Sequence, residues 1–234
     1  MLFDYTRRTA IDDRYRTRQE DQRIGWNDDY QSRIDRIQQI LELYPIPSNS
    51  RVLELGCGAG NIALYLAGQG YQAYGIDLSV AAISWAEEKK QELNVSTTFS
   101  VGNVVELTEY TNESFDLIVD GDCLWMIIGA DRKECLANIH RILKPDGLLI
   151  ANAKLMNEEI QTRYYINPDN IFDPKLQCLT QEGIPYYYLS REKEFITELT
   201  QTGFKVLETK LFPPKHNEHP LIVGSLSAVV RKNI

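Results

Sequence analysis

A cluster of glycines stands where an apolar, strand-like run meets the start of a helix. Gly56, Gly58 and Gly60 directly follow the run 51–55. Glycine allows tight turns and a close approach of the backbone to a ligand, and open α/β sheets bind ligands beyond the carboxyl ends of their strands. A dinucleotide loop would need glycine in place of Asn61, and a phosphate-binding loop would end in Gly-Lys-Ser/Thr, which this sequence lacks. The pattern predicts another kind of ligand-binding loop, with a purely structural turn as the alternative.

Polar side chains follow the next two expected strands. Asp77 ends the run 72–77, where a carboxylate can accept hydrogen bonds from both ribose hydroxyls of a nucleoside. Asn103 follows the third strand, and its amide could face an adenine edge with a donor and an acceptor. Leu78 and Val104 would then form apolar walls. The alternative for Asn103, which follows a glycine, is ordinary turn chemistry.

Two acids and an indole follow the expected strand 115–120. Asp120 and Asp122 flank a glycine, and Trp125 comes three residues later. Carboxylates at this position could take or orient the proton of an amine nucleophile. We therefore predict both acids to be catalytic. The alternatives are that the acids belong to a turn and that Trp125 is a core residue.

Strands and helices alternate along the middle of the chain, which predicts βαβ units and a doubly wound, mostly parallel sheet. The last two strands are separated by an eight-residue loop, so they are expected to pair as an antiparallel hairpin. The expected strands are 51–55, 72–77, 96–101, 115–120, 148–153, 204–212 and 221–231, and a Lys-Pro-Asp-Gly turn precedes the fifth. The expected helices are 28–43, 61–67, 79–93, 131–143 with Asp131 as N-cap, and 191–201.

These motifs, in this order, resemble those of class I S-adenosylmethionine-dependent methyltransferases of the small-molecule type. The matching segments are 52–60, Asp77, 102–104, 115–120 and 141–147. The resemblance implies a Rossmann-like, seven-stranded sheet with its last strand antiparallel, and S-adenosylmethionine as cofactor. The family often has Asp where this chain has Asn103, but Asn can still accept a hydrogen bond from the adenine amino group. The cofactor contacts it implies are Glu54, Gly56, Cys57, Gly58, Gly60, Asp77, Leu78, Asn103, Val104 and Asp120.

A single methyltransferase domain is expected over residues 1–234. Its parts are an N-terminal helical arm (1–47), a cofactor-binding core (48–153), a substrate-lid insertion (154–190), and a C-terminal helix with a hairpin (191–234). The arm and the insertion are expected to contact the substrate, although packing roles are the alternative for their aromatic residues. The expected substrate contacts are Trp26, Trp125, Tyr164, Tyr165 and Tyr187.

Charge and composition limit the kinds of binding partner that the chain is expected to have. The chain has 25 Lys+Arg against 33 Asp+Glu, and this net charge of −8 disfavours a broad nucleic-acid surface. The arginines before residue 24 alternate with acids, which is typical of a solvated helix. No window is apolar enough to span a membrane, and the four cysteines lack paired spacing, so we expect a reducing, cytoplasmic location. His216 and His219 have no acidic or cysteine partners at ligand spacing, so no metal site is expected.

The sequence therefore predicts a methyltransferase acting on a small molecule, as a monomer or homodimer. Acids in the pocket would favour an amine nitrogen slightly over an oxygen. The alternatives are a protein or tRNA methyltransferase, a non-catalytic module that binds S-adenosylmethionine, and another use of the same cofactor.

Overall fold

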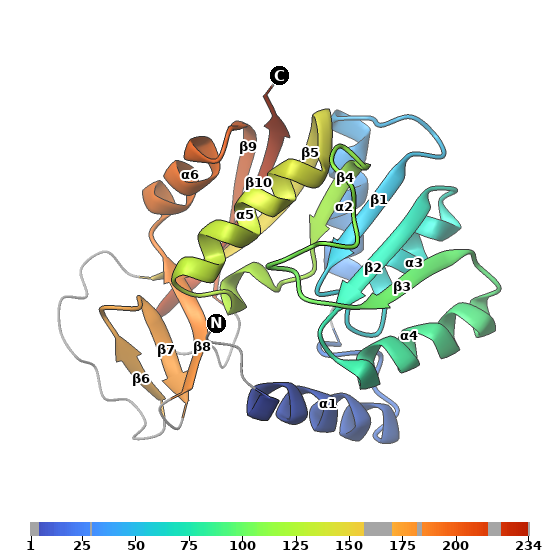
Figure 1. The fold of residues 1–234 in the computed structure, drawn as a ribbon, viewed down its shortest axis with the longest axis horizontal. Helices are drawn as coiled ribbons and strands as arrows, with labels where there is room; N and C mark the ends of the chain where they lie inside the picture. The colour runs from blue at the N-terminus through green and yellow to red at the C-terminus, as the bar shows by residue number, and fades with distance from the viewer. Residues whose placement is uncertain (1–4, 29, 157–169, 182–183, 215–220, 234) are drawn as a thin grey trace.

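The computed structural model describes residues 5–28, 30–156, 170–181, 184–214 and 221–233. Its centre is a sheet with the strand order β3-β2-β1-β4-β5-β10-β9 (Figure 1). The first five are parallel, and β10 runs antiparallel to both β5 and β9, which confirms the expected sheet. The strands are β1 (Arg51–Leu55), β2 (Gln72–Asp77), β3 (Thr97–Val101), β4 (Phe115–Asp120), β5 (Leu143–Met156), β9 (Phe204–Phe212) and β10 (Ile222–Lys232).

Helices cover both faces of this sheet (Figure 1). On one face, α2 (Gln31–Leu43) buries Ile37 and Ile40 together with residues of α3 (Asn61–Gly68) and of five strands. On the other face, α5 (Ala130–Ile142) and α6 (Glu192–Gln201) bury side chains in the larger core cluster. Each helix turns one apolar stripe to the sheet, and this burial supplies most of the folding free energy.

The N-terminal arm forms a helix that docks on α4 (Val80–Leu93). This helix, α1 (Tyr5–Glu20), is rich in charge, but Tyr15 is only 5% exposed and packs with Trp85 and Ala82 of α4. Asp12 accepts hydrogen bonds from the Ser79 hydroxyl and from the Ala81 amide, at the first turn of α4. A carboxylate is favoured at a helix N-terminus, so these contacts fix α1 beside the strand ends.

The insertion is more regular than expected. It contains β6 (Asn170–Asp173), β7 (Cys178–Gln181) and β8 (Ile184–Ser190), which pair antiparallel. The end of β8 pairs with the end of β5, so the sheet has ten strands instead of seven. Leu179, Leu189 and Met156 form a small core of their own. Apolar burial between these strands explains the regular pairing.

Two local expectations are wrong. The Lys-Pro-Asp-Gly segment is a bulge inside β5, because pairing with β4 moves from Phe115–Leu143 to Leu117–Leu148. Helix α5 begins at residue 130 with Gly129 as N-cap, and Asp131 lies in its first turn. A carboxylate in the first turn is stabilised by the helix dipole without capping it.

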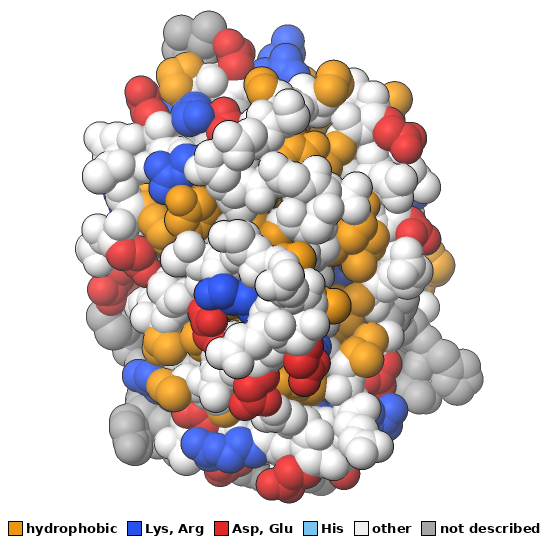
Figure 2. All heavy atoms as spheres, turned by 90° about the vertical axis from the view of Figure 1, so that its right-hand side faces the viewer, with side chains coloured by type: hydrophobic (Ala, Val, Ile, Leu, Met, Phe, Trp, Pro, Cys, Tyr) orange, Lys and Arg blue, Asp and Glu red, His pale blue; other side chains and the backbone are white. Residues whose placement is uncertain are grey.

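The surface carries charges of both signs. Figure 2 shows acidic and basic side chains spread among neutral and apolar ones on one face of the molecule. Of the helices in the described part of the chain, none has the length and apolar character needed to cross a membrane.

Candidate functional site

A cavity of about 710 Å³ opens at the carboxyl ends of the central strands. It brings together nearly all the predicted site residues, although they come from distant segments. Gly60 is not part of its lining, and Tyr164 and Tyr165 lie outside the described residues. The predicted residues that line it are Trp26, Glu54, Gly56, Cys57, Gly58, Asp77, Leu78, Asn103, Val104, Asp120, Asp122, Trp125 and Tyr187.

The glycine loop has two different functions along its length. Gly58 lines the cavity with φ +52°, and a Cβ there would lie 2.5 Å from the Tyr15 hydroxyl oxygen. A side chain at this position would therefore collide with Tyr15, so glycine lets this ring pack against the loop. Gly60 caps α3 with φ +74°, and a Cβ there would meet the Phe99 ring at 2.6 Å. Gly60 shapes the turn and lies behind the cavity wall.

Glu54 places a buried carboxyl group at the cavity's end near α3. The side chain is 2% exposed, and one oxygen accepts a 2.8 Å hydrogen bond from the Ala63 amide. Burial raises the pKa of Glu54 to about 8, although Ala63 and Arg33 act in the opposite direction. A ligand ammonium group would stabilise the charged form that burial disfavours.

Asp77 is oriented by backbone amides. One of its carboxylate oxygens accepts from Gly58 N at 2.8 Å and the other from Ser79 N at 2.9 Å. Burial raises the pKa of Asp77 despite these two hydrogen bonds. Each carboxylate oxygen has a further lone pair, so the group can also accept from ligand hydroxyls.

Asn103 makes local contacts with its side-chain amide. Its oxygen accepts from Val105 N at 3.0 Å, and its nitrogen donates to Glu106 at 3.1 Å. These bonds orient the amide at the end of β3 beside Val104, where both residues line the cavity. The amide oxygen and nitrogen each keep capacity for one further hydrogen bond.

Asp120 is fully buried and bound to the backbone. One oxygen accepts from Cys123 N and Leu124 N at 2.9 and 3.1 Å, and the other accepts from Asn152 N at 3.1 Å. Burial and the neighbouring Asp122 raise the pKa of Asp120 to about 6, against the effect of the amides. These contacts stabilise the turn after β4.

Asp122 forms an ion pair with α2. Its carboxylate lies 2.8 Å from Arg33, and the Asn152 side chain donates to it at 3.3 Å. Arg33 also donates to the Asp120 carbonyl oxygen at 3.1 Å. Although burial opposes ionisation, Asp122 and Asp120 raise the pKa of Arg33, so the guanidinium stays charged.

Trp125 is held by a buried arginine. It belongs to η1 (Leu124–Met126), whose first carbonyl accepts a 2.6 Å hydrogen bond from Arg132. Arg132 also makes two hydrogen bonds to Glu198 of α6, at 2.7 and 2.8 Å. This link between α5, α6 and η1 fixes Trp125 in the cavity wall, where Lys154 lies 4.9 Å above its ring.

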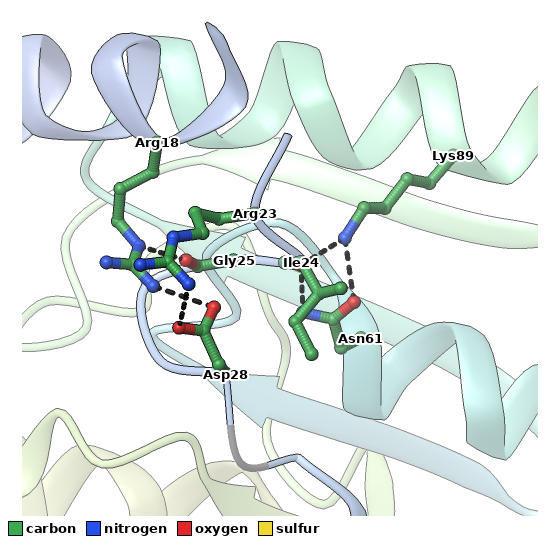
Figure 3. A network of polar contacts seen from close by, with 7 residues as sticks. All are labelled: Arg18, Arg23, Ile24, Gly25, Asp28, Asn61 and Lys89. Atoms are coloured by element: carbon green, nitrogen blue, oxygen red, sulfur yellow. Dashed lines mark hydrogen bonds and ion pairs between the residues drawn. The ribbon is translucent and has the colours of Figure 1, made fainter. Parts of the chain in front are cut away.

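Ion pairs and a hydrogen bond hold the segment after α1 in a closed loop (Figure 3). Asp28 accepts from Arg18 at 2.9 Å and from Arg23 at 3.0 Å, and Arg18 also donates to the Gly25 carbonyl. The loop closed by these contacts carries Trp26, whose ring lies 5.2 Å from that of Tyr15. Both rings line the cavity.

The same segment is tied to the core by Lys89 of α4 (Figure 3). Lys89 donates to the Ile24 carbonyl and, at 2.8 Å, to Asn61, which itself donates to Ile24 at 2.9 Å. Burial lowers the pKa of Lys89 to about 8. We call these contacts of Lys89, Asn61 and Ile24 the latch.

Several cavity residues are missing from the sequence prediction. Arg33 and Arg36 lie on the apolar stripe of α2, beside Ile37. Charged residues on a stripe that is otherwise apolar could have indicated a buried polar site. Tyr15 stands in a highly charged arm without apolar periodicity, which concealed its burial. Asn152, Lys154, Ser225 and Ser227 also line the cavity.

Potential metal ligands do not cluster in the part of the chain that the structure describes. There, no three His, Cys, Asp or Glu side chains are arranged to hold a metal ion. His216 and His219 lie outside these residues.

Comparison with known proteins identifies similar chains. Residues 53–151 match a family model described as a methyltransferase domain. An uncharacterized methyltransferase of Schizosaccharomyces pombe is 30% identical over 125 residues, covering 53% of this chain and 83% of that protein. A Geobacillus sp. (strain WCH70) protein named as a methyltransferase is 28% identical over 154 residues, which are 65% of this chain but only 58% of that protein.

The fold also matches solved structures. The 1,6-didemethyltoxoflavin-N1-methyltransferase of Burkholderia thailandensis superposes with a TM-score of 0.68 at 19% identity, covering 100% of this chain and 92% of that one. That structure contains 1,6-didemethyltoxoflavin and S-adenosylhomocysteine. At this identity the likeness concerns the fold.

Proposed function

Because this chain belongs to the class I S-adenosylmethionine-dependent methyltransferases, we propose that it transfers a methyl group to a small-molecule acceptor in the cavity described above. The observation that carries the proposal is one continuous cavity of about 710 Å³. It joins the glycine loop and Asp77 on one side to Trp125 and Lys154 on the other. The volume lies in the range of pockets that enclose small molecules.

The residues on the first side fit the family's cofactor. Glu54, a buried acid with a raised pKa, would bind the ammonium group, and Asp77 would accept from the ribose hydroxyls. Asn103 and Val104 would meet the adenine. Gly58 would bring its backbone to the cofactor beside Tyr15, and both residues line the cavity. S-adenosylmethionine supplies the electrophilic methyl group when bound.

The chain's own contribution is positioning and exclusion of water. Aligned reactants and a closed site can provide much of the rate acceleration of a group transfer. Tyr15 and Trp26 line the cavity, and the latch anchors the segment that carries Trp26. Arg33 and Asp122 form an ion pair on the side next to α2. No residue needs to form a covalent bond with the substrate.

The site residues constrain the atom that receives the methyl group less than they constrain the cofactor. The sequence favours an amine slightly, because Asp120 and Asp122 would place two acids in the pocket. Asp120 binds three backbone amides and Asp122 pairs with Arg33, so neither presents a bare carboxylate. We therefore extend the proposal to oxygen as well as nitrogen acceptors.

A small acceptor is favoured over a protein or tRNA by the N-terminal segment. This segment, with Trp26, is tied down next to the cavity by the latch and by the Asp28 ion pairs. The Burkholderia neighbour acts on a small heterocycle within the same fold, which also supports the proposal.

Ligand binding followed by turnover tests the proposal. We expect S-adenosylhomocysteine, and not NAD, to raise the melting temperature, since a ligand at 100 times its Kd adds about 2.7 kcal/mol to stability. Amines, phenols and carboxylates are then screened by release of S-adenosylhomocysteine from S-adenosylmethionine. Stabilisation by NAD alone would contradict the proposal. Binding without turnover of any acceptor would support the non-catalytic alternative.

A further inference from the structure

The side of the cavity away from the glycine loop has a polar floor. In the β5–β10 pair, Ser227 lies opposite Asn152 and Ser225 lies opposite Lys154. Opposite residues of an antiparallel pair project from the same face, and all four line the cavity. We call these four residues the floor.

Helix α2 lies beside this floor. One step further along the same two strands, Val229 pairs with Ile150, and both are buried with Ile37 of α2. One turn of α2 thus packs on an apolar pair next to the floor. Arg36, adjacent to Ile37, lines the cavity and makes a 2.7 Å ion pair with Glu208 of β9.

Two donors at this place lack a protein partner. The Ser227 hydroxyl and the Arg36 Nε are buried, and neither has a hydrogen-bond partner among the described residues. Ser227 is 4% and Arg36 9% exposed. A buried polar group left unpaired costs about 1–3 kcal/mol, so such groups need an explanation. The other three atoms of this kind belong to residues outside the cavity lining, namely Arg51, Thr97 and Arg231.

The chemistry of these donors selects the ligand. A guanidinium can only donate, and a serine hydroxyl donates readily, so both favour an oxygen acceptor. Lys154 adds a positive charge to the floor, whereas Asp122 is neutralised by Arg33 and Glu208 by Arg36. An oxygen acceptor that carries negative charge makes the stronger hydrogen bonds with such donors, so the two unpartnered groups favour an anion.

We propose that the acceptor carries a carboxylate, and that this group accepts hydrogen bonds from Arg36 Nε and Ser227 Oγ beside Lys154. The inference rests on the proposed function, since it assigns the acceptor class of the same cavity. Ile37, Ile150 and Trp125 line the cavity too and would contact an apolar or aromatic body. The acceptor class is thus an apolar carboxylic acid.

Matched probes test the charge preference. We would use the carboxylates phenylacetate, indole-3-acetate and 1-naphthylacetate, each with its primary amide and the corresponding 2-arylethylamine, and measure Kd by calorimetry in saturating S-adenosylhomocysteine. In at least one series the carboxylate should bind tenfold or more tightly than its amide, and the amine most weakly. If no carboxylate in the three series binds better than its amide, the proposal is overturned.

Variants test the two donors. Ser227→Ala removes the hydroxyl, and Arg36→Lys removes Nε while keeping a charge for Glu208. Each should weaken the carboxylate probe about five- to tenfold and the amide clearly less, because a neutral carbonyl oxygen accepts a weaker hydrogen bond than a carboxylate. Thr97→Ala and Arg231→Lys are the controls, because they remove equally unpartnered donors outside the cavity, and they should change neither Kd. Wild-type carboxylate affinity in Ser227→Ala overturns the assignment.

The two proposals fail in different ways. If S-adenosylhomocysteine does not bind the wild-type chain, the proposed function fails, and the probes are then measured without it. Carboxylate binding that depends on Ser227 would still support the anion site. If S-adenosylhomocysteine binds and methylation proceeds on acceptors without a carboxylate at full rate in Ser227→Ala, only the further inference fails.

Discussion

The two sides of the cavity are built from contacts of very different range. On the cofactor side, Glu54 is bound by an amide 9 residues away, and Asp77 by amides 2 and 19 residues away. On the acceptor side, Arg33 reaches a carbonyl 87 residues away, and Arg36 reaches an acid 172 residues away. The cofactor side is thus assembled within consecutive strand–loop–helix units, and the acceptor side by contacts between segments far apart in the chain.

This difference suggests that the two sides can be perturbed separately. A backbone-bound acid in a short loop keeps its orientation whatever the distant helices do. Side chains of α2 and β10 depend on how helix and sheet pack, so they can change with the acceptor while the cofactor loops stay the same. The predictions below test this independence.

The largest effect is expected for Asp77→Ala. The change removes the acceptor of the ribose hydroxyls, and hydrogen bonds to a charged group contribute about 1.5–3 kcal/mol each. Affinity for S-adenosylhomocysteine should fall at least tenfold, and about a hundredfold if two bonds are lost. Calorimetry measures the change. An unchanged affinity would move the ribose site elsewhere.

Asp116→Ala is the matched control for stability. Asp116 also binds a backbone amide, that of Arg51, at 2.9 Å, and pairs with Lys144, but it does not line the cavity. Both variants should lose about 1–3 kcal/mol of unfolding free energy. Only Asp77→Ala should lose cofactor affinity.

The second prediction concerns pH and Glu54. With a pKa of about 8, its carboxyl group is mostly protonated at neutral pH in the free protein, and a bound ammonium would favour the charged form. Binding must then release a proton. Affinity for S-adenosylhomocysteine should rise with pH, by up to about tenfold per unit between pH 6 and 8, because binding is linked to deprotonation.

Calorimetry in buffers of different ionisation enthalpy counts the released proton. Glu54→Gln should abolish both the release and the rise in affinity. The same variant should also reduce the pH dependence of the unfolding free energy of the free protein. In the wild type this free energy falls between pH 4.5 and 8, because the folded state holds the Glu54 proton more tightly than the unfolded state does. Proton uptake on binding would contradict the assignment of the ammonium to Glu54.

The third prediction separates the two acids after β4. Asp122→Asn breaks the ion pair with Arg33, so turnover of an acceptor found by screening should fall about tenfold, with less than a twofold change in S-adenosylhomocysteine affinity. Asp120→Asn leaves one carbonyl oxygen for three amides, and should cost about 1–3 kcal/mol of stability. If Asp122→Asn weakened cofactor binding as much as turnover, the two sides would not be independent.

The sequence separation between contacting residues also explains which parts of the site could be predicted from the sequence. Glycine spacing and a strand-end acid are local signals, so the loop at Gly58 and the position of Asp77 could be read from neighbouring residues. Ser227 looks like any polar residue of a C-terminal strand until its pairing with Asn152 places it in the cavity. Its role depends on register across 75 residues, counted from 227 to 152, which no local pattern encodes.

Two segments show the same limit within the fold. Tyr15 lies in a helix whose charge suggested full solvation, and its burial comes from contact with α4. The strands β6, β7 and β8 were expected as irregular chain, because prolines and tyrosines hide their alternation. Pairing with the end of β5 supplies the order.

The smallest effect is expected at the latch, which joins the N-terminal segment to the cofactor side. Lys89→Met removes the donor to the Ile24 carbonyl and to Asn61, and keeps a similar apolar stem. Lys90→Met is the control, because Lys90 forms an ion pair with Glu87 of the same helix.

Losing the latch should loosen residues 22–28 without unfolding the core, because each lost hydrogen bond to a charged donor contributes only about 1.5–3 kcal/mol. Trp26 would then cover the cavity for a smaller fraction of the time, so S-adenosylhomocysteine should dissociate two- to fivefold faster in Lys89→Met and at the wild-type rate in Lys90→Met. Amide exchange over 22–28 and stopped-flow dissociation measure the two effects. Faster exchange with unchanged dissociation would show that this segment closes only the acceptor side. Equal behaviour of both variants would mean that the ion pairs of Asp28 suffice to hold the segment in place.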